Sequence, residues 1–155
     1  MAVRSCRQCS QGFEVTRGWQ AFCGNKCRVA WHRENTHCFY CGAHGATDRD
    51  HIYPVALRGS RSFEGQETVK ACGDCNGALG GRSLDLEERI AFLMAHVVKK
   101  YKLHETAVQW SDEEIAELGP ILRRRIKRFL AKRKQGEERI LYLQYLAEYV
   151  AAFGP

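Results

Sequence analysis

Hydrophobic residues recur at helical spacing after residue 84. Between residues 84 and 101 they fall three or four positions apart, which predicts one helix with a single buried stripe. The members of that stripe are Ile90, Leu93, Met94, Val97 and Tyr101. Asp85 stands just before the run and Glu88 follows three residues later, a capping-box pattern that places the start of the helix here.

Three further helices are predicted towards the C-terminus. The sequence SDEE at 111–114 is a second capping box and predicts a short acidic helix. Pro120 suits the first turn of the next helix, which is strongly basic and covers 120–134. Gly136 interrupts that helix, and 137–153 predicts a last helix whose wide apolar face indicates central packing.

The first half of the chain is organised by cysteine instead. All eight cysteines lie between residues 6 and 75 and fall into four close pairs. The pairs are Cys6/Cys9, Cys23/Cys27, Cys38/Cys41 and Cys72/Cys75. Their distribution predicts an N-terminal zinc finger over 1–36, a second zinc module over 37–83 and a helical region over 84–155.

Two close cysteine pairs can present four thiolates to one tetrahedral Zn²⁺. Sequential pairing of the four pairs closes the shorter loops and is the expected arrangement, giving two structural zinc ions. The alternatives are interleaved pairing, with pairs one and three sharing one ion, and cysteines that are simply buried or disulfide-bonded. Four thiolates leave no open position for water, so neither zinc site is expected to be catalytic.

The stretch GFEVTRGWQAF inside the first zinc finger is long enough for a hairpin. Its apolar side chains are expected to pack beneath the zinc site: Phe13, Val15 and Trp19. Three histidines are potential substitute ligands, but eight cysteines already complete two sites, so they are expected at the surface or facing DNA: His32, His37 and His44.

The stretch DRDHIYP at 48–54 places an acid directly before a histidine. A hard ion such as Mg²⁺ or Mn²⁺ prefers oxygen ligands, which Asp50 and the side-chain carbonyl of Asn76 could supply, with Asp48 in reserve. His51 would then be free to act as general base on an attacking water. Neighbours on a regular strand face opposite sides, so the strand is expected to bend or end there. The alternative is that these acids are surface groups and the histidine is packed.

The segments CFYCGAHGATDRDHIYP and ETVKACGDCNGALGGR, within residues 37–82, resemble HNH endonucleases that carry a Cys₄ zinc beneath a ββα-metal site. The resemblance implies a zinc-stapled, treble-clef-like core and, with the finger and the helical region, the fold class α+β. It also implies that Asp50 and Asn76 bind one catalytic Mg²⁺ or Mn²⁺, and that His51 is the general base.

Two more site residues follow from the same resemblance. Glu67 stands where the family has a middle Asn that pins the loop carrying the catalytic His, so the donor function of the amide is lost here. Arg82 matches the family's basic residue after the last knuckle and is expected to contact a phosphate. The shorter sequence FCGNKCR resembles the second knuckle and helix start of a treble-clef finger.

The net charge alone is weak support for a polyanionic partner, so the positions of the basic residues along the chain carry the argument. The net charge is +6 with a pI near 9.0, but zinc-bound thiolates offset part of that excess. Residues 120–134 carry eight basic residues and no acid, and their apolar residues predict a buried stripe of Leu122, Ile126, Phe129 and Leu130. The residues expected to contact the DNA backbone are Arg58, Arg61, Arg82, Arg123, Arg124, Arg125, Lys127 and Arg128. A solvated face balanced by nearby acids is the alternative.

These observations predict a metal-dependent endonuclease that hydrolyses DNA phosphodiester bonds. The resemblance implies 5′-phosphate and 3′-hydroxyl ends. Junction-cleaving members related to recombination endonuclease VII share the arrangement, so a branched substrate is one alternative. A non-catalytic zinc module that binds nucleic acid or protein is the other. The N-terminus lacks an apolar leader and no stretch approaches about 20 apolar residues, so a cytoplasmic protein without a membrane role is expected, of phage, mobile-element or chromosomal origin.

Overall fold

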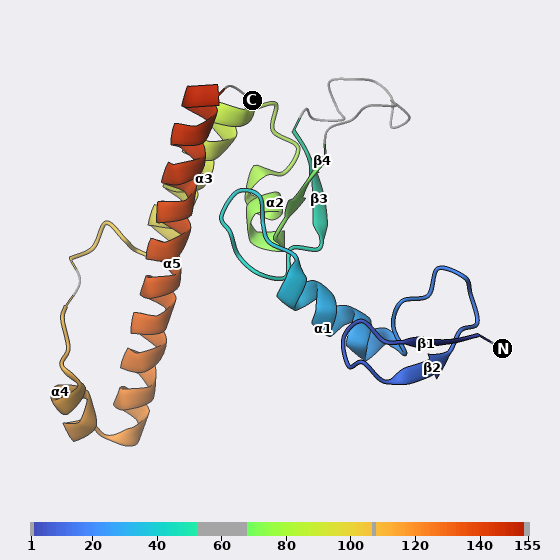
Figure 1. The fold of residues 1–155 in the computed structure, drawn as a ribbon. Helices are drawn as coiled ribbons and strands as arrows, with labels where there is room; N and C mark the ends of the chain where they lie inside the picture. Colours follow the sequence, from blue (N-terminus) through green and yellow to red (C-terminus); the bar gives the residue numbers. More distant parts are fainter. Residues whose placement is uncertain (1, 53–67, 107, 154–155) are drawn as a thin grey trace.

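The computed structural model describes residues 2–52, 68–106 and 108–153, which form a mixed α+β fold (Figure 1). The elements in chain order are β1 (Val3–Ser5), β2 (Gly12–Glu14), α1 (Asn25–Asn35), β3 (Asp48–His51), β4 (Thr68–Ala71), α2 (Gly73–Leu79), α3 (Leu86–Lys100), α4 (Asp112–Glu117) and α5 (Pro120–Phe153). Within this described part, no helix is both long and apolar enough to cross a membrane.

The N-terminal module is a small hairpin followed by a helix. Strands β1 and β2 pair antiparallel, with Ser5 opposite Gly12, so the first cysteine knuckle forms the turn between them. The prediction of a hairpin within GFEVTRGWQAF is wrong, because that stretch supplies only β2 and its partner β1 precedes the knuckle. Trp19 does not pack beneath the zinc site, because 76% of it is exposed. Helix α1 begins directly after Gly24, as FCGNKCR suggested.

The central module is a two-stranded antiparallel sheet followed by a short helix. Strand β3 pairs with β4 from Asp48↔Ala71 to His51↔Thr68. Cys72 then caps the N-terminus of α2. The backbone N–H of Phe39 donates to the Lys70 carbonyl oxygen at 2.8 Å, which ties the Cys38–Cys41 knuckle to β4. Two strands and a helix therefore share one zinc-braced unit.

Helix α3 follows the sequence prediction closely. Asp85 accepts a hydrogen bond from the Glu88 backbone and Glu88 reciprocates, forming the predicted capping box. Ile90, Leu93 and Val97 are each at most 2% exposed. The predicted stripe is therefore the side of α3 that faces the core.

The predicted break at Gly136 is wrong. Helix α5 runs unbroken from Pro120 to Phe153, with Gly136 buried against α3. A Cβ on Gly136 would lie 2.5 Å from the Cβ of Tyr101, so the glycine lets two helices approach closely. Local helix propensity counts against glycine, but the packing of α3 against α5 outweighs it here.

Of the two burial predictions for α5, one is wrong and the other holds in part. The stripe expected in its basic half is largely exposed, since Leu122 and Phe129 keep 49% and 42% of their surface although the short helix α4 packs against α5. The C-terminal half packs against the core as predicted, but on one side only. It buries Leu143, Leu146 and Val150, but an aromatic side remains in solvent. One neighbouring helix cannot cover so wide an apolar face.

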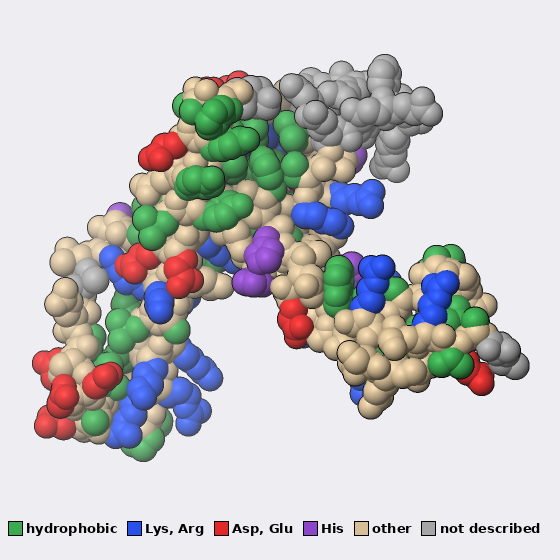
Figure 2. Space-filling view, in the orientation of Figure 1, with side chains coloured by type: hydrophobic (Ala, Val, Ile, Leu, Met, Phe, Trp, Pro, Cys, Tyr) green, Lys and Arg blue, Asp and Glu red, His purple; other side chains and the backbone are tan. Residues whose placement is uncertain are grey.

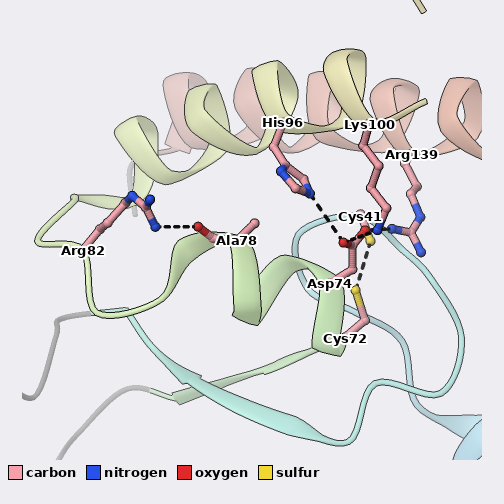
Figure 3. A network of polar contacts seen from close by, with 8 residues as sticks. All are labelled: Cys41, Cys72, Asp74, Ala78, Arg82, His96, Lys100 and Arg139. Carbon is pink, nitrogen blue, oxygen red and sulfur yellow. Dashed lines mark hydrogen bonds and ion pairs between the residues drawn. The ribbon is translucent and has the colours of Figure 1, made fainter. Parts of the chain in front are cut away.

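One hydrophobic core joins the central module to α3 and α5. At its edge, Asp74 of α2 accepts hydrogen bonds from Arg139 Nη1 at 2.6 Å, from Lys100 Nζ and from His96 Nε2 at 3.4 Å (Figure 3). Partial burial opposes ionisation of Asp74, but Lys100, His96 and Arg139 together hold its pKa below the ordinary value. A single carboxylate therefore fastens both long helices to the zinc-braced unit.

Candidate metal centres and the Asp-His strand

The central module holds four cysteine sulfurs in the geometry of a zinc site. The Sγ atoms of Cys38, Cys41, Cys72 and Cys75 all lie within 4.8 Å of one another. Cys41 and Cys72 Sγ are 3.8 Å apart, close to the edge of about 3.8 Å that a tetrahedron with zinc–sulfur bonds near 2.3 Å requires. The four residues fit one structural Zn²⁺.

The thiols of this cluster shift one another's pKa. Hydrogen bonds from the side chains of Cys38, Cys41 and Cys75 lower the pKa of Cys72 far below its usual range. Contact with the thiols of Cys38, Cys41 and Cys72 raises the pKa of Cys75, and mainly its contact with Cys41 lowers the pKa of Cys38 to about 7. Four thiolates at this spacing repel one another, so full deprotonation requires a bound cation.

A second cluster has the same spacing in a more exposed setting. The ligand atoms of Cys6, Cys9, Cys23 and Cys27 lie within 4.8 Å of one another, with 3.7 Å between the sulfurs of Cys9 and Cys23. Cys9 and Cys23 are exposed, whereas Cys6 is buried. Sequential pairing of the knuckles is thus confirmed. The three histidines considered as substitute ligands belong to neither cluster.

Asp50, the predicted ion ligand, is held in a buried ion pair. Its Oδ2 accepts a hydrogen bond from the Tyr40 hydroxyl at 2.5 Å and another from Arg89 Nη1 at 2.6 Å. Burial, and then the contact with Asp50, raise the pKa of Tyr40, so its hydroxyl stays protonated and donates. Both contacts use the same carboxylate oxygen, and neither uses Oδ1.

Asn76, the other predicted ion ligand, reaches Asp48. Its Nδ2 donates a hydrogen bond to Asp48 Oδ2 at 3.3 Å, from the second turn of α2 to the start of β3. Among the described residues no side chain is hydrogen-bonded to the amide carbonyl of Asn76, which is a hard oxygen donor. The residue that the structure brings against Asn76 is therefore Asp48, the reserve ligand, and not Asp50.

His51 is the last residue of β3, so the strand runs regularly through Asp50 and His51 and the bend or end expected between them is absent. Its pairing with Thr68 is regular, which places its side chain on the opposite face of the hairpin from Asp50. Among the described residues, its Nδ1 is buried without a hydrogen-bond partner. The histidine and the Asp50 carboxylate are adjacent in sequence but do not share a face.

Of the remaining predicted residues, some lie outside the described part of the chain and the others lie on or near α2 and on α5. Glu67, Arg58 and Arg61 lie outside the described residues. Arg82 folds back over α2, where its Nη1 donates to the Ala78 carbonyl oxygen at 2.7 Å (Figure 3). The same atom donates to the Leu79 carbonyl oxygen at 3.1 Å, and the guanidinium stacks on Phe92 at 4.7 Å. The basic residues of α5 considered for DNA contact lie on its N-terminal half.

Sequence reasoning missed Arg89 and Tyr40. A signal for Arg89 was present: it falls three residues after Leu86 and four before Leu93, both of them buried, so a cation occupies a position of the apolar stripe. A buried arginine needs an anionic partner. Asp50 lies 39 residues away, so only the fold could identify it as that partner.

Comparisons with protein-family models, with curated proteins and with solved structures give no match. Local geometry is therefore the basis on which a function can be argued.

Proposed function

We propose that the chain is a metal-dependent endonuclease that hydrolyses nucleic-acid phosphodiester bonds, with DNA as its expected substrate. The observation that carries the proposal is the zinc-braced order of hairpin and helix, with His51 ending β3 and Asn76 directly following the last zinc-knuckle cysteine on α2. This order of elements agrees with the ββα-metal arrangement that the sequence resembles.

The oxygen donors of the proposed site are Asp48, Asp50 and Asn76. A hard divalent ion bound by such oxygens would stabilise charge that develops on the phosphate and on the leaving oxygen. Carboxylates that bind metals are commonly held by hydrogen bonds on their other oxygen. Tyr40 and Arg89 supply that support at Asp50 Oδ2, so the proposal assigns Oδ1 to the ion.

His51 is assigned the general base. Its buried Nδ1 requires a polar partner, and the attacking water would be that partner. Taking one proton from the water produces the nucleophile, and the imidazolium then carries the added charge. For this to happen the end of β3 has to turn when substrate binds, because the hairpin places His51 and Asp50 on opposite faces.

The test is plasmid nicking by zinc-loaded protein with added Mn²⁺ or Mg²⁺. General base catalysis contributes about 10²- to 10⁴-fold, so His51→Ala should lose at least about 100-fold in rate. His104→Ala, which removes an exposed histidine of the loop after α3, is the matched control and should cut like wild type. If wild type and His51→Ala nick the plasmid equally, His51 is not the general base.

Variants of the acids separate the two candidate ion ligands. If Asp50 binds the ion, Asp50→Asn raises the Mn²⁺ concentration needed for half-maximal nicking more than Asp48→Asn does. The opposite order would transfer the ligand role to Asp48, beside Asn76. Preferential cutting of four-way junctions over linear duplex would favour the junction-resolving alternative.

One observation favours a second candidate function. The ion pair with Arg89 accounts for the burial of Asp50 without any added ion, as expected of a non-catalytic zinc module that binds nucleic acid or protein. If the chain is such a module, His51→Ala should bind DNA with the affinity of the wild type, and neither of these two proteins should nick the plasmid.

A further inference from the structure

Helix α5 carries a row of cations along one side of its N-terminal half. A shallow surface groove there is lined by Pro120, Arg123, Arg124, Lys127, Arg128 and Ala131. The guanidinium of Arg123 turns back to the Ala116 and Leu118 carbonyl oxygens at the end of α4. Arg124, Lys127 and Arg128 are exposed and available to a ligand.

The C-terminal half of the same helix carries a row of exposed aromatic rings. Tyr145, Tyr149 and Phe153 keep 64%, 50% and 76% of their surface, and Tyr142 keeps 39%. Ring centroids are 6.5 Å apart between Tyr142 and Tyr145 and 5.1 Å apart between Tyr149 and Phe153. We call these four residues the aromatic row. Soluble proteins rarely leave such a row uncovered without a ligand for it.

The cations and the aromatic row lie on the same side of α5. Arg124 and Tyr142 are about five helical turns apart, and so are Lys127 and Tyr145, so each pair points in the same direction. The separation along the axis is about 27 Å. Figure 2 shows Lys and Arg gathered over the lower half of the helix and hydrophobic side chains over its upper half. Glu138 falls between the two parts.

We propose that this side of α5 binds an unpaired nucleic-acid strand, with phosphates on Arg124, Lys127 and Arg128 and bases stacked on the aromatic row. Cations attract phosphates whatever the sequence, and aromatic rings stack on the faces of unpaired bases. A duplex hides those faces inside its base-pair stack, so the rings would gain little from it. The cations select a nucleic acid, and the rings select its unpaired form.

The inference concerns binding and does not depend on hydrolysis. It extends the proposed function by one step, because a nuclease with such a surface would prefer flapped, gapped or branched DNA to an intact duplex. Binding can be measured without added Mg²⁺ or Mn²⁺, so failure of the proposed chemistry would leave this test intact.

The experiment is fluorescence anisotropy of zinc-loaded full-length protein with a labelled oligo(dT) strand and with a duplex of equal length. Tyr145→Ala and Tyr149→Ala should each weaken binding to the single strand about 5-fold or more, and binding to the duplex less than 2-fold. Tyr145→Phe keeps the ring and should bind oligo(dT) like wild type. Lys127→Ala should weaken both complexes and reduce their salt dependence.

Leu141→Ala is the matched control, since Leu141 is 65% exposed but lies beside the aromatic row. It should change neither complex. Equal losses for single strand and duplex, or a loss as large in Leu141→Ala, would overturn the proposal. So would light scattering that shows a dimer dispersed by Tyr145→Ala, because a second copy of the chain would then occupy this side.

Discussion

Arg89 Nη1 donates a hydrogen bond to Asp50 Oδ2 at 2.6 Å, and the two side chains are only 1% and 7% exposed. The pair joins the first residues of α3 to strand β3, the strand that carries the Asp-His sequence. Tyr40, from the zinc knuckle, donates to the same oxygen. The carboxylate expected to hold an ion is therefore also the point where three parts of the core meet.

Removing Arg89 should destabilise the fold strongly. Breaking a buried ion pair from one side typically costs about 3 to 5 kcal/mol, because the remaining charge stays buried without its partner. Arg89→Met is expected to lower the free energy of unfolding by that amount in urea titrations of the zinc-loaded protein. The double variant Arg89→Met/Asp50→Asn leaves no buried charge without a partner, so it should lose less unfolding free energy than the two single variants added together. A loss as large as that sum would contradict this account.

Alanine substitution at two glycines should change the stability of the fold in opposite directions. Gly136→Ala places a methyl group against Tyr101 and should destabilise by about 1 to 3 kcal/mol, since both helices would have to move apart. Gly77, inside α2, has no atom of the described residues within 4 Å of an added Cβ, so Gly77→Ala should stabilise by about 0.5 to 1 kcal/mol. Thermal unfolding followed by circular dichroism measures both. Similar effects of the two changes would show that close helix packing at Gly136 does not matter.

The two zinc ions should leave at different rates. The N-terminal cluster has two exposed cysteines, whereas three of the four cysteines in the central cluster are buried. When excess chelator is added, a metal-sensitive dye should therefore report one equivalent of zinc that leaves fast and one that leaves slowly. Both should leave faster at lower pH, because protons compete with zinc for the thiolates. Cys9→Ser should abolish the fast phase and leave the slow one. Loss of both phases would mean that the clusters are coupled.

Asp74 should matter more than an ordinary surface acid. Hydrogen bonds from charged donors contribute about 1.5 to 3 kcal/mol, and Asp74 has two such partners, Lys100 on α3 and Arg139 on α5. Asp74→Asn is expected to cost about 2 kcal/mol of unfolding free energy at pH 7. Because its pKa is lowered, the contribution is present above about pH 4 and disappears as acid protonates the folded carboxylate. Glu113→Gln, on the exposed face of α4, is the control and should change stability by less than about 0.5 kcal/mol.

Much of the fold was predictable because its signals are local. Both capping boxes, at Asp85 and Ser111, form as predicted, since each needs only residues within one helical turn. The buried stripe of α3 follows from helical spacing alone. The four cysteine pairs likewise revealed two tetrahedral sites, because the spacing within each knuckle fixes how its two thiolates can be presented.

The sequence by itself determined which residues can hold zinc, where most helices begin and which side of α3 is buried. Only the tertiary structure decided that the knuckles pair sequentially, that α5 continues through Gly136, that Asp50 pairs with Arg89 and that Asn76 reaches Asp48. The reason is sequence distance. A cap or a stripe is set by neighbours a few residues away, but an ion pair or a close helix crossing depends on groups that only the folded core brings together.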